Sequence, residues 1–437
     1  MEERMSRKIF WLVFLFLTIQ VYSQNKPLTL RDCIDMALKE SPDYKLANIQ
    51  MKSSKAGISA SYSGILPRLS SSLGARSSTQ GPSEYVFNNI TFRRGDTTTY
   101  YYNFGLNLYQ NIYDGGKWWN NIKLAKLLFS NSRLYMEQVR QYIIMNVTQK
   151  FYELLKAQQM LKVYQSALES SEEQLKKTEE LFRVGKVAER DVFKARVNVG
   201  NNKLSLLQQR TAVENAQMEL NFAIGRAPDV PIVVVEKEYK RPIKISKEEA
   251  VNAALSSNLE LTMMEMEKEA AFINYKINKA DLYPSIYSSF SYSRGGAEFS
   301  KVYTPLDKWW NTSIGITLSW SIFDGFSRKS RIIQSWLDYK SYDEKIDKKK
   351  KEVLKQVDAL LNMLNTYIEM LEISGVNIKS AEEDLRLARE MYKLNSATLL
   401  EVLDAEVKLT RAKAVMISTM YDAKIAEAQL LYLMGEL

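Results

Sequence analysis

Carboxylates, amines and hydroxyls are the groups that could do chemistry in this chain of 437 residues, because histidine is absent and Cys33 is the single cysteine. This composition excludes a disulfide within one chain and the usual His/Cys zinc sites. There is no nucleophile motif, and the carboxylates fall on the faces of expected helices instead of forming a separate constellation. We therefore expect no catalytic site, no metal site and no cofactor.

The thiol and the basic residues have structural explanations. Cys33 lies within residues 30–38, where the apolar side chains have helical spacing, so we expect a core thiol and not a lipid-attachment site. The formal net charge of +9 is a modest excess that is spread along the chain. The lysine run 348–351 has acidic neighbours on a long helix, which favours a solvated face or a membrane-proximal collar over nucleic-acid binding.

Residues 1–23 have the pattern of a secretory signal peptide. A basic start is followed by an apolar run from Ile9 to Val21 and by small residues near Ser23. The run is shorter than the roughly 20 residues of a membrane-spanning helix, so a retained anchor is the weaker alternative. We expect an exported chain that begins near Gln24, with no later helical membrane span.

The chain contains two copies of one unit. An offset of 217 residues takes Pro67 onto Pro284, and an offset of 210 residues takes Tyr113-Asp114-Gly115 onto Phe323-Asp324-Gly325. Because the change of offset falls wholly between these two landmarks, one loop there differs in length.

Two repeats and a linker follow from this duplication. The first copy covers residues 24–226 and the second covers 243–437. The linker between them, 227–242, is marked by three prolines. In each copy we expect a helix, two strands and then two long helices joined by a turn.

The long helices have the pattern of antiparallel coiled-coil hairpins over 116–225 and 326–435. From Lys117 to Phe182 there is neither proline nor glycine, and at about 1.5 Å per residue such a helix is roughly 100 Å long. Apolar residues recur every seven positions, which is typical of coiled-coil seams. The seam of the first copy is Val147, Leu154, Leu161, Leu168, Leu175 and Phe182, then Val192, Val199, Leu206, Val213 and Leu220.

Each predicted hairpin turns at a short tip. The tips are Arg183, Val184, Gly185 and Lys186 in the first copy, and Lys393, Leu394, Asn395 and Ser396 in the second. Each tip holds a glycine or an asparagine, the residues that most readily adopt the left-handed conformation that ends a helix.

Four segments alternate between apolar and polar residues, at about 68–80, 100–113, 285–294 and 312–323. About ten such residues is the length and pattern of a membrane-spanning β-strand, with lipid on one side and water on the other. Aromatic residues flank the strands, as in an interfacial girdle. A half-buried sheet of a soluble domain is the open alternative.

Four strands per chain are too few for a closed barrel, which needs at least about eight. A membrane-spanning sheet of this chain therefore requires oligomerisation. Three copies would supply 12 strands, although the sequence does not choose three over two or four.

These features together resemble the TolC family of outer-membrane efflux proteins over essentially the whole mature chain. The resemblance rests on the duplication, on the prolines that enter the strands and on the Asp-Gly exits. It also rests on the tip Arg183-Val184-Gly185, which Asp191-Val192 follows. It implies a chain that is mainly α with a small β part and forms a homotrimer in the outer membrane, extending into the periplasm.

The resemblance also implies how such a protein works. Three chains would form a 12-stranded barrel in outer-membrane lipid over an α-helical tunnel. A periplasmic adaptor (membrane fusion) protein would dock at the hairpin tips and connect the channel to an inner-membrane efflux pump or a secretion ATPase.

A periplasmic gate is a further implication of the resemblance. The acidic pair of the family falls on Glu401 and Asp404, its tyrosine on Tyr392, and the acidic partner of that tyrosine on Asp191. Ala397 occupies the place of the basic residue of the gate, so one link is missing. The alternative is that Asp191 and Glu401 merely stabilise helix N-termini.

The predicted function is therefore passive export as the outer-membrane channel of a tripartite efflux system. A type I protein-secretion outlet is the runner-up, because it has the same architecture. An exported structural or adhesion coiled-coil protein would explain the seams and the signal, but not the four alternating strands.

Overall fold

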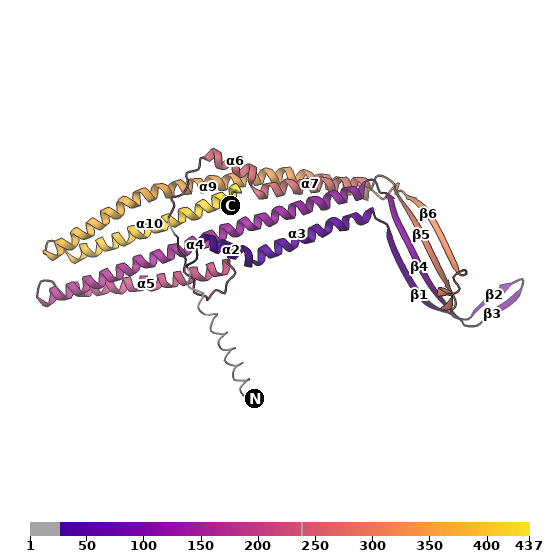
Figure 1. The fold of residues 1–437 in the computed structure, drawn as a ribbon, viewed down its shortest axis with the longest axis horizontal. Helices are drawn as coiled ribbons and strands as arrows, with labels where there is room; N and C mark the ends of the chain where they lie inside the picture. The colour runs from indigo at the N-terminus through magenta and orange to yellow at the C-terminus, as the bar shows by residue number, and fades with distance from the viewer. Residues whose placement is uncertain (1–26, 237–238) are drawn as a thin grey trace, which may run out of the picture. The chain divides into compact units, whose positions relative to one another are not determined.

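The computed structural model describes residues 27–236 and 239–437 (Figure 1). The predicted signal peptide, 1–23, lies outside the described residues. The chain is mainly helical with a small β part, as the sequence predicts. Among the described residues, no helix combines the length and the apolar character needed to cross a bilayer.

Nine α-helices and six strands make up the described chain (Figure 1). The helices are α2 (Leu30–Glu40), α3 (Pro42–Ser61), α4 (Lys117–Arg183), α5 (Glu189–Ala223), α6 (Lys247–Ser257), α7 (Leu259–Ala280), α8 (Ser300–Tyr303), α9 (Ser327–Lys393) and α10 (Leu399–Met434). The strands are β1 (Arg68–Gln80), β2 (Ser83–Phe87), β3 (Ile90–Arg94), β4 (Thr97–Tyr113), β5 (Ser285–Gly296) and β6 (Trp310–Ser319).

Contacts divide the chain into two compact units. The helical unit comprises the chain up to Asn48 with Tyr135–Thr262 and Lys348–Leu437, and the sheet unit comprises Ile49–Leu134 and Met263–Asp347. Each unit takes segments from both predicted copies, so the compact units do not follow the duplication.

The prediction of one short helix before each pair of strands is wrong, because two helices stand there. In the first copy α2 and α3 are separated at Ser41, since Pro42 lacks an amide hydrogen and disfavours helical backbone in the residue before it. In the second copy the break is at Asn258, whose side chain accepts a hydrogen bond from the backbone of Leu261 and starts α7.

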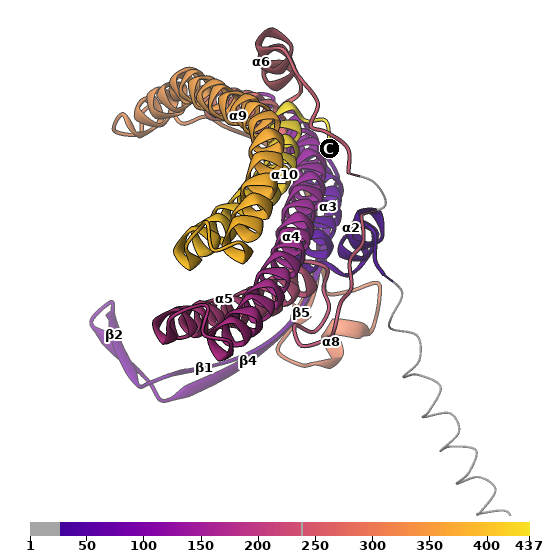
Figure 2. The same cartoon turned by 90° about the vertical axis from the view of Figure 1, so that its left-hand side faces the viewer.

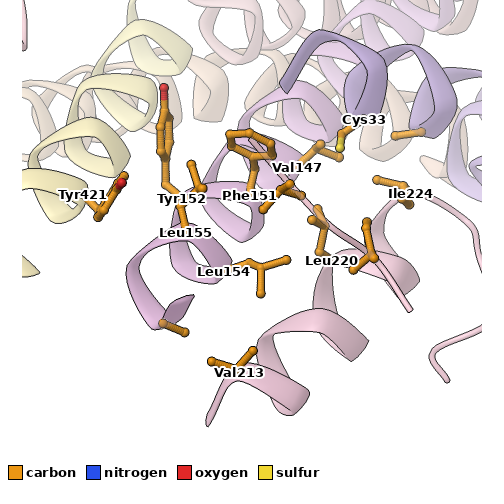
Figure 3. Packing of buried hydrophobic residues seen from close by; sticks show 14 of the residues in the cluster. Cys33, Val147, Phe151, Tyr152, Leu154, Leu155, Val213, Leu220, Ile224 and Tyr421 are labelled. Atoms are coloured by element: carbon orange, nitrogen blue, oxygen red, sulfur yellow. The ribbon is translucent and has the colours of Figure 1, made fainter. Parts of the chain in front are cut away.

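The core of the helical unit is formed where α2, α4 and α5 pack together (Figure 3). Phe151 and Leu154 of α4 belong to this core together with Leu220 of α5, and all three are almost fully buried. Burying one such side chain stabilises the fold by about 1.5–3 kcal/mol. Cys33 is fully buried among them, which confirms the predicted core thiol, and this burial raises its pKa to about 12.

The predicted seams are buried or half-buried except at Phe182, where the prediction is wrong. Phe182 is 44% exposed, and the neighbouring Leu181 packs against the cluster near the tips instead. This departure is local, because the corresponding residue of the second copy, Tyr392, is 6% exposed.

Four strands form one antiparallel sheet in the order β1-β4-β5-β6. The register places one apolar side chain from each strand in a single row across one face, namely Leu69, Leu108, Phe290 and Ile314. The adjacent row on the other face is polar, namely Ser70, Asn107, Ser291 and Ser313. The alternation predicted from the sequence therefore gives the sheet one apolar and one polar face.

The last predicted strand, 312–323, is shifted in the structure, where β6 begins at Trp310 and ends at Ser319. After that point the chain serves the following turn: the Trp320 indole donates to the carbonyl of Leu282, and the Ser321 carbonyl accepts from Arg328. The apolar and polar residues continue to alternate in the sequence after Ser319, but the chain there no longer pairs with β5.

The two connections between the predicted strands contain further structure. The connection between β1 and β4 holds a separate hairpin of β2 and β3, and the connection between β5 and β6 holds α8. The first copy therefore has four strands and not two, although only two of them belong to the main sheet.

The Asp-Gly exit of the first copy requires glycine at position 115 for a steric reason. Its φ is +73°, and a Cβ added there would lie 2.6 Å from the carbonyl oxygen of Ala280. Only glycine fits this close approach between the end of α7 and the start of α4.

Candidate functional site

The two hairpins end in the same kind of turn. Gly185 has φ +76° and Asn395 has φ +58°, so both occupy the left-handed region, as the sequence predicts. The amide of Lys186 donates to the Leu181 carbonyl at 2.9 Å, and that of Ser396 donates to the Met391 carbonyl at 2.9 Å. These bonds satisfy carbonyls at the helix ends and give the two tips matching shapes.

The tips present exposed apolar side chains, and basic residues stand near them in the chain. Val184 is 67% exposed and Leu394 is 75% exposed, while Arg183, Lys186 and Lys393 lie next to them in the chain.

A groove of about 640 Å³ lies between α4 and α9 close to the tips. The residues that line it include Gln174, Leu181, Val184, Leu385, Tyr392 and Lys393. The groove therefore extends the tip surface along the contact between the two hairpins.

The predicted acidic pair lies at the start of α10, where both side chains are exposed. Glu401 accepts hydrogen bonds from the backbone and the hydroxyl of Thr398 in a capping box, as expected for a residue that stabilises a helix start. Asp404 pairs with Lys408 at 2.6 Å on the helix surface. Each carboxylate thus has a partner on, or at the cap of, its own helix.

Tyr392 and Asp191 come close together, but no hydrogen bond joins them among the described residues. Tyr392 is 6% exposed. Burial raises the pKa of its hydroxyl, and the negative charge of Asp191 raises this pKa further. Asp191 instead pairs with Lys194 at 3.3 Å along α5.

The sequence analysis missed a buried carboxylate that joins four helices. Glu406 of α10 is 8% exposed and accepts hydrogen bonds from α9, α4 and α5. The donors are Arg389 at 2.7 Å, Ser170 at 3.1 Å and Asn198 at 3.3 Å. We call these four residues the Glu406 cluster.

The Glu406 cluster borders a cavity of about 700 Å³ within the helical unit. One sequence signal could have found it. Glu406 follows Val402, the counterpart of the seam residue Val192 in the second copy, by four positions, so it lies on the same helix face. A charge on a seam face requires partners, because burying an unpaired charge is costly.

Comparison with known proteins assigns these hairpins and strands to a family. The family model described as "Outer membrane efflux protein" matches residues 33–226 and 250–436. The chain belongs to the outer membrane efflux protein family.

Two relatives illustrate the range of this efflux family. The chain is 24% identical over 344 residues to outer membrane protein TolC of Salmonella enteritidis, covering 76% of the chain and 68% of that protein. It is 22% identical over 441 residues to the alkaline protease secretion protein AprF of Pseudomonas aeruginosa, covering 99% of the chain and 89% of that protein.

The fold of this outer membrane efflux protein is that of solved channels. It is similar to the Campylobacter jejuni CmeC outer membrane channel, with a TM-score of 0.80 and 18% identity, over 93% of the chain and 85% of CmeC. The protein is thus an outer-membrane channel, and its relatives are channel and transport proteins and not enzymes.

Proposed function

We propose that three copies of this outer membrane efflux protein join their sheets into a 12-stranded barrel above an α-helical tunnel, forming a passive export conduit. The observation that carries the proposal is the exposed apolar row across one face of the sheet, where Leu69 is 70% and Ile314 is 83% exposed. Among the described residues, the outer edges of β1 and β6 have no strand beside them. A sheet in lipid must close its edges, and four strands do so only with further copies.

The hairpin tips are the proposed docking site for a periplasmic adaptor protein. Their exposed apolar side chains, their basic neighbours and the groove between α4 and α9 support this assignment. Through the adaptor the channel would receive cargo from an inner-membrane efflux pump, which supplies the energy.

The proposed periplasmic gate consists of Glu401, Asp404, Tyr392 and Asp191. Three related sets of carboxylates converging on one axis would repel each other and attract cations, so the entrance should prefer cations. Opening would slide the second hairpin against the first, and the Glu406 cluster would resist that movement because it bonds one hairpin to the other.

The test of the channel and its gate is conductance in planar bilayers. We expect Glu401→Ala combined with Asp404→Ala to weaken cation selectivity, measured as a smaller reversal potential in a salt gradient. The matched control is Glu172→Ala with Glu173→Ala, an exposed acidic pair on α4. An unchanged reversal potential in the first variant would remove these residues from the gate, and a soluble periplasmic monomer would reject the conduit.

A type I protein-secretion outlet is the second candidate, supported by the similarity to AprF, a secretion protein by name. Deleting the gene distinguishes the secretion function from the efflux function. Loss of a secreted protein from the medium favours secretion, whereas increased sensitivity to small toxic compounds or ions favours efflux.

A further inference from the structure

The hairpin of β2 and β3 is a small amphipathic element that the conduit does not use. Residues paired across two strands lie on the same face, so the register sorts its side chains. One face carries the pairs Tyr85–Phe92 and Phe87–Ile90, and the other carries Glu84–Arg93 and Val86–Thr91. The hairpin therefore has an aromatic and aliphatic face opposite a largely polar one.

The apolar face of the hairpin is well formed but uncovered. Tyr85, Phe87, Ile90 and Phe92 are 59%, 64%, 59% and 42% exposed, respectively, and the rings of Tyr85 and Phe92 stack at 5.2 Å. Asn88 and Asn89 have φ of 49° and 64°, as in the tightest hairpin turns. Because a lone two-stranded hairpin is only marginally stable in water, this face needs a covering surface.

A second uncovered apolar surface lies on the connection between β5 and β6. Its exposed members are Phe299, Tyr303, Leu306 and Trp309, at 51%, 59%, 76% and 52%.

This second surface is firmly held. The Arg294 side chain is 4% exposed and donates to the carbonyls of Pro305 and Lys308, and the Lys301 ammonium lies 4.7 Å from the Trp309 ring centroid. The connection is thus a prebuilt surface and not a loose loop.

The topology puts the two surfaces at the same end of the sheet. The hairpin follows the last residue of β1, and the second surface precedes the first residue of β6, with α8 packed on β4 and β5. Figure 2 shows the hairpin and α8 apart from each other, with the labels of β1, β4 and β5 between them. The side chains of both surfaces are exposed, so within one copy neither surface covers the other.

We propose that the apolar face of the β2–β3 hairpin packs on the β5–β6 connection of a neighbouring copy. This inference rests on the proposed closure, in which β1 of one copy pairs with β6 of the next and brings the two surfaces together. The contact continues the strand-to-strand interface beyond the barrel and holds adjacent subunits at its outer end.

Cysteine cross-linking of the full-length protein in outer membranes tests this contact. All variants carry Cys33→Ala. Phe92→Cys is combined with Leu306→Cys, and the matched control combines Thr91→Cys with Leu306→Cys, because Thr91 neighbours Phe92 on the polar face. A short bismaleimide should give covalent dimers and trimers with several-fold higher yield from the first pair.

Two measurements separate the possible failures. Trimers seen in unheated gels, with equal cross-linking of both pairs, would overturn the hairpin contact and leave the barrel intact. Absence of trimers would reject the closure and, with it, this contact. Quenching by brominated lipids of a fluorophore on Phe92→Cys would show that the face lies against the membrane, which also overturns the proposal.

Discussion

At the scale of single residues, the acidic side chains differ in where their partners lie. Glu401 and Asp404 bond to groups next to them on α10, so a sliding movement of the hairpins would leave those bonds intact. The bonds of Glu406 run to α4 and α5 of the first hairpin, so the same movement must break them. Of these three carboxylates, Glu406 is therefore the one coupled to the packing of one hairpin on the other.

We expect Glu406→Gln to weaken this link, because a neutral amide oxygen accepts more weakly than a carboxylate from Ser170 and Asn198. The amide also loses the charge-assisted bond to Arg389. A hydrogen bond to a charged group contributes about 1.5–3 kcal/mol, and the partly exposed guanidinium places the loss toward the lower end of that range. The measurement is single-channel conductance, which should rise, together with a lower dissociation temperature of the trimer. Glu401→Gln is the control, and equal behaviour of the two variants would contradict the proposed role of Glu406.

At the scale of elements, each tip needs a residue that adopts the left-handed conformation, and each tip also presents exposed side chains. Asn395 adopts a left-handed conformation at the place that corresponds to Gly185. Gly185→Asn should therefore keep the turn, whereas Gly185→Val should strain it by about 1–2 kcal/mol. The turn and the charges of the tip can consequently be altered separately.

Charge reversal at the first tip, Arg183→Glu with Lys186→Glu, should abolish efflux while trimers remain in the outer membrane. The reason is that the substitutions change only exposed side chains at the proposed adaptor surface. The measurement is compound accumulation in cells with trimer content as the folding control, and Gly185→Asn serves as the matched active variant. Full efflux in the charge-reversed variant would remove this tip from the docking surface.

At the scale of the whole molecule, the proposed barrel would turn the apolar face of the sheet to lipid and its polar face to water. Ile316 is 75% exposed on the apolar face, and the next residue, Thr317, lies on the polar face. Ile316→Lys should cost up to about 2–4 kcal/mol in the membrane, depending on depth, and reduce the amount of trimer. Thr317→Lys should leave assembly intact. Equal amounts of heat-sensitive trimer in the two variants would contradict lipid contact on the apolar face.

The sequence alone determined the features that depend on local period. Seven-residue spacing predicted the long hairpins, two-residue alternation predicted the main sheet, and Gly185 and Asn395 marked the tips. Errors arose where a local signal was overridden. Pro42 divided an expected single helix, and at the end of α4 Leu181, not Phe182, packs against the neighbouring helices.

Only the tertiary structure decided which groups meet across the chain. Ser170 and Asn198 lie 236 and 208 residues away from Glu406, and no local period records such a pairing. The apolar row across the sheet likewise depended on the register of four strands drawn from both halves of the chain. Side-chain period is a property of one element, whereas burial and pairing are properties of several elements packed together, so the sequence predicted the elements and the structure assigned their contacts.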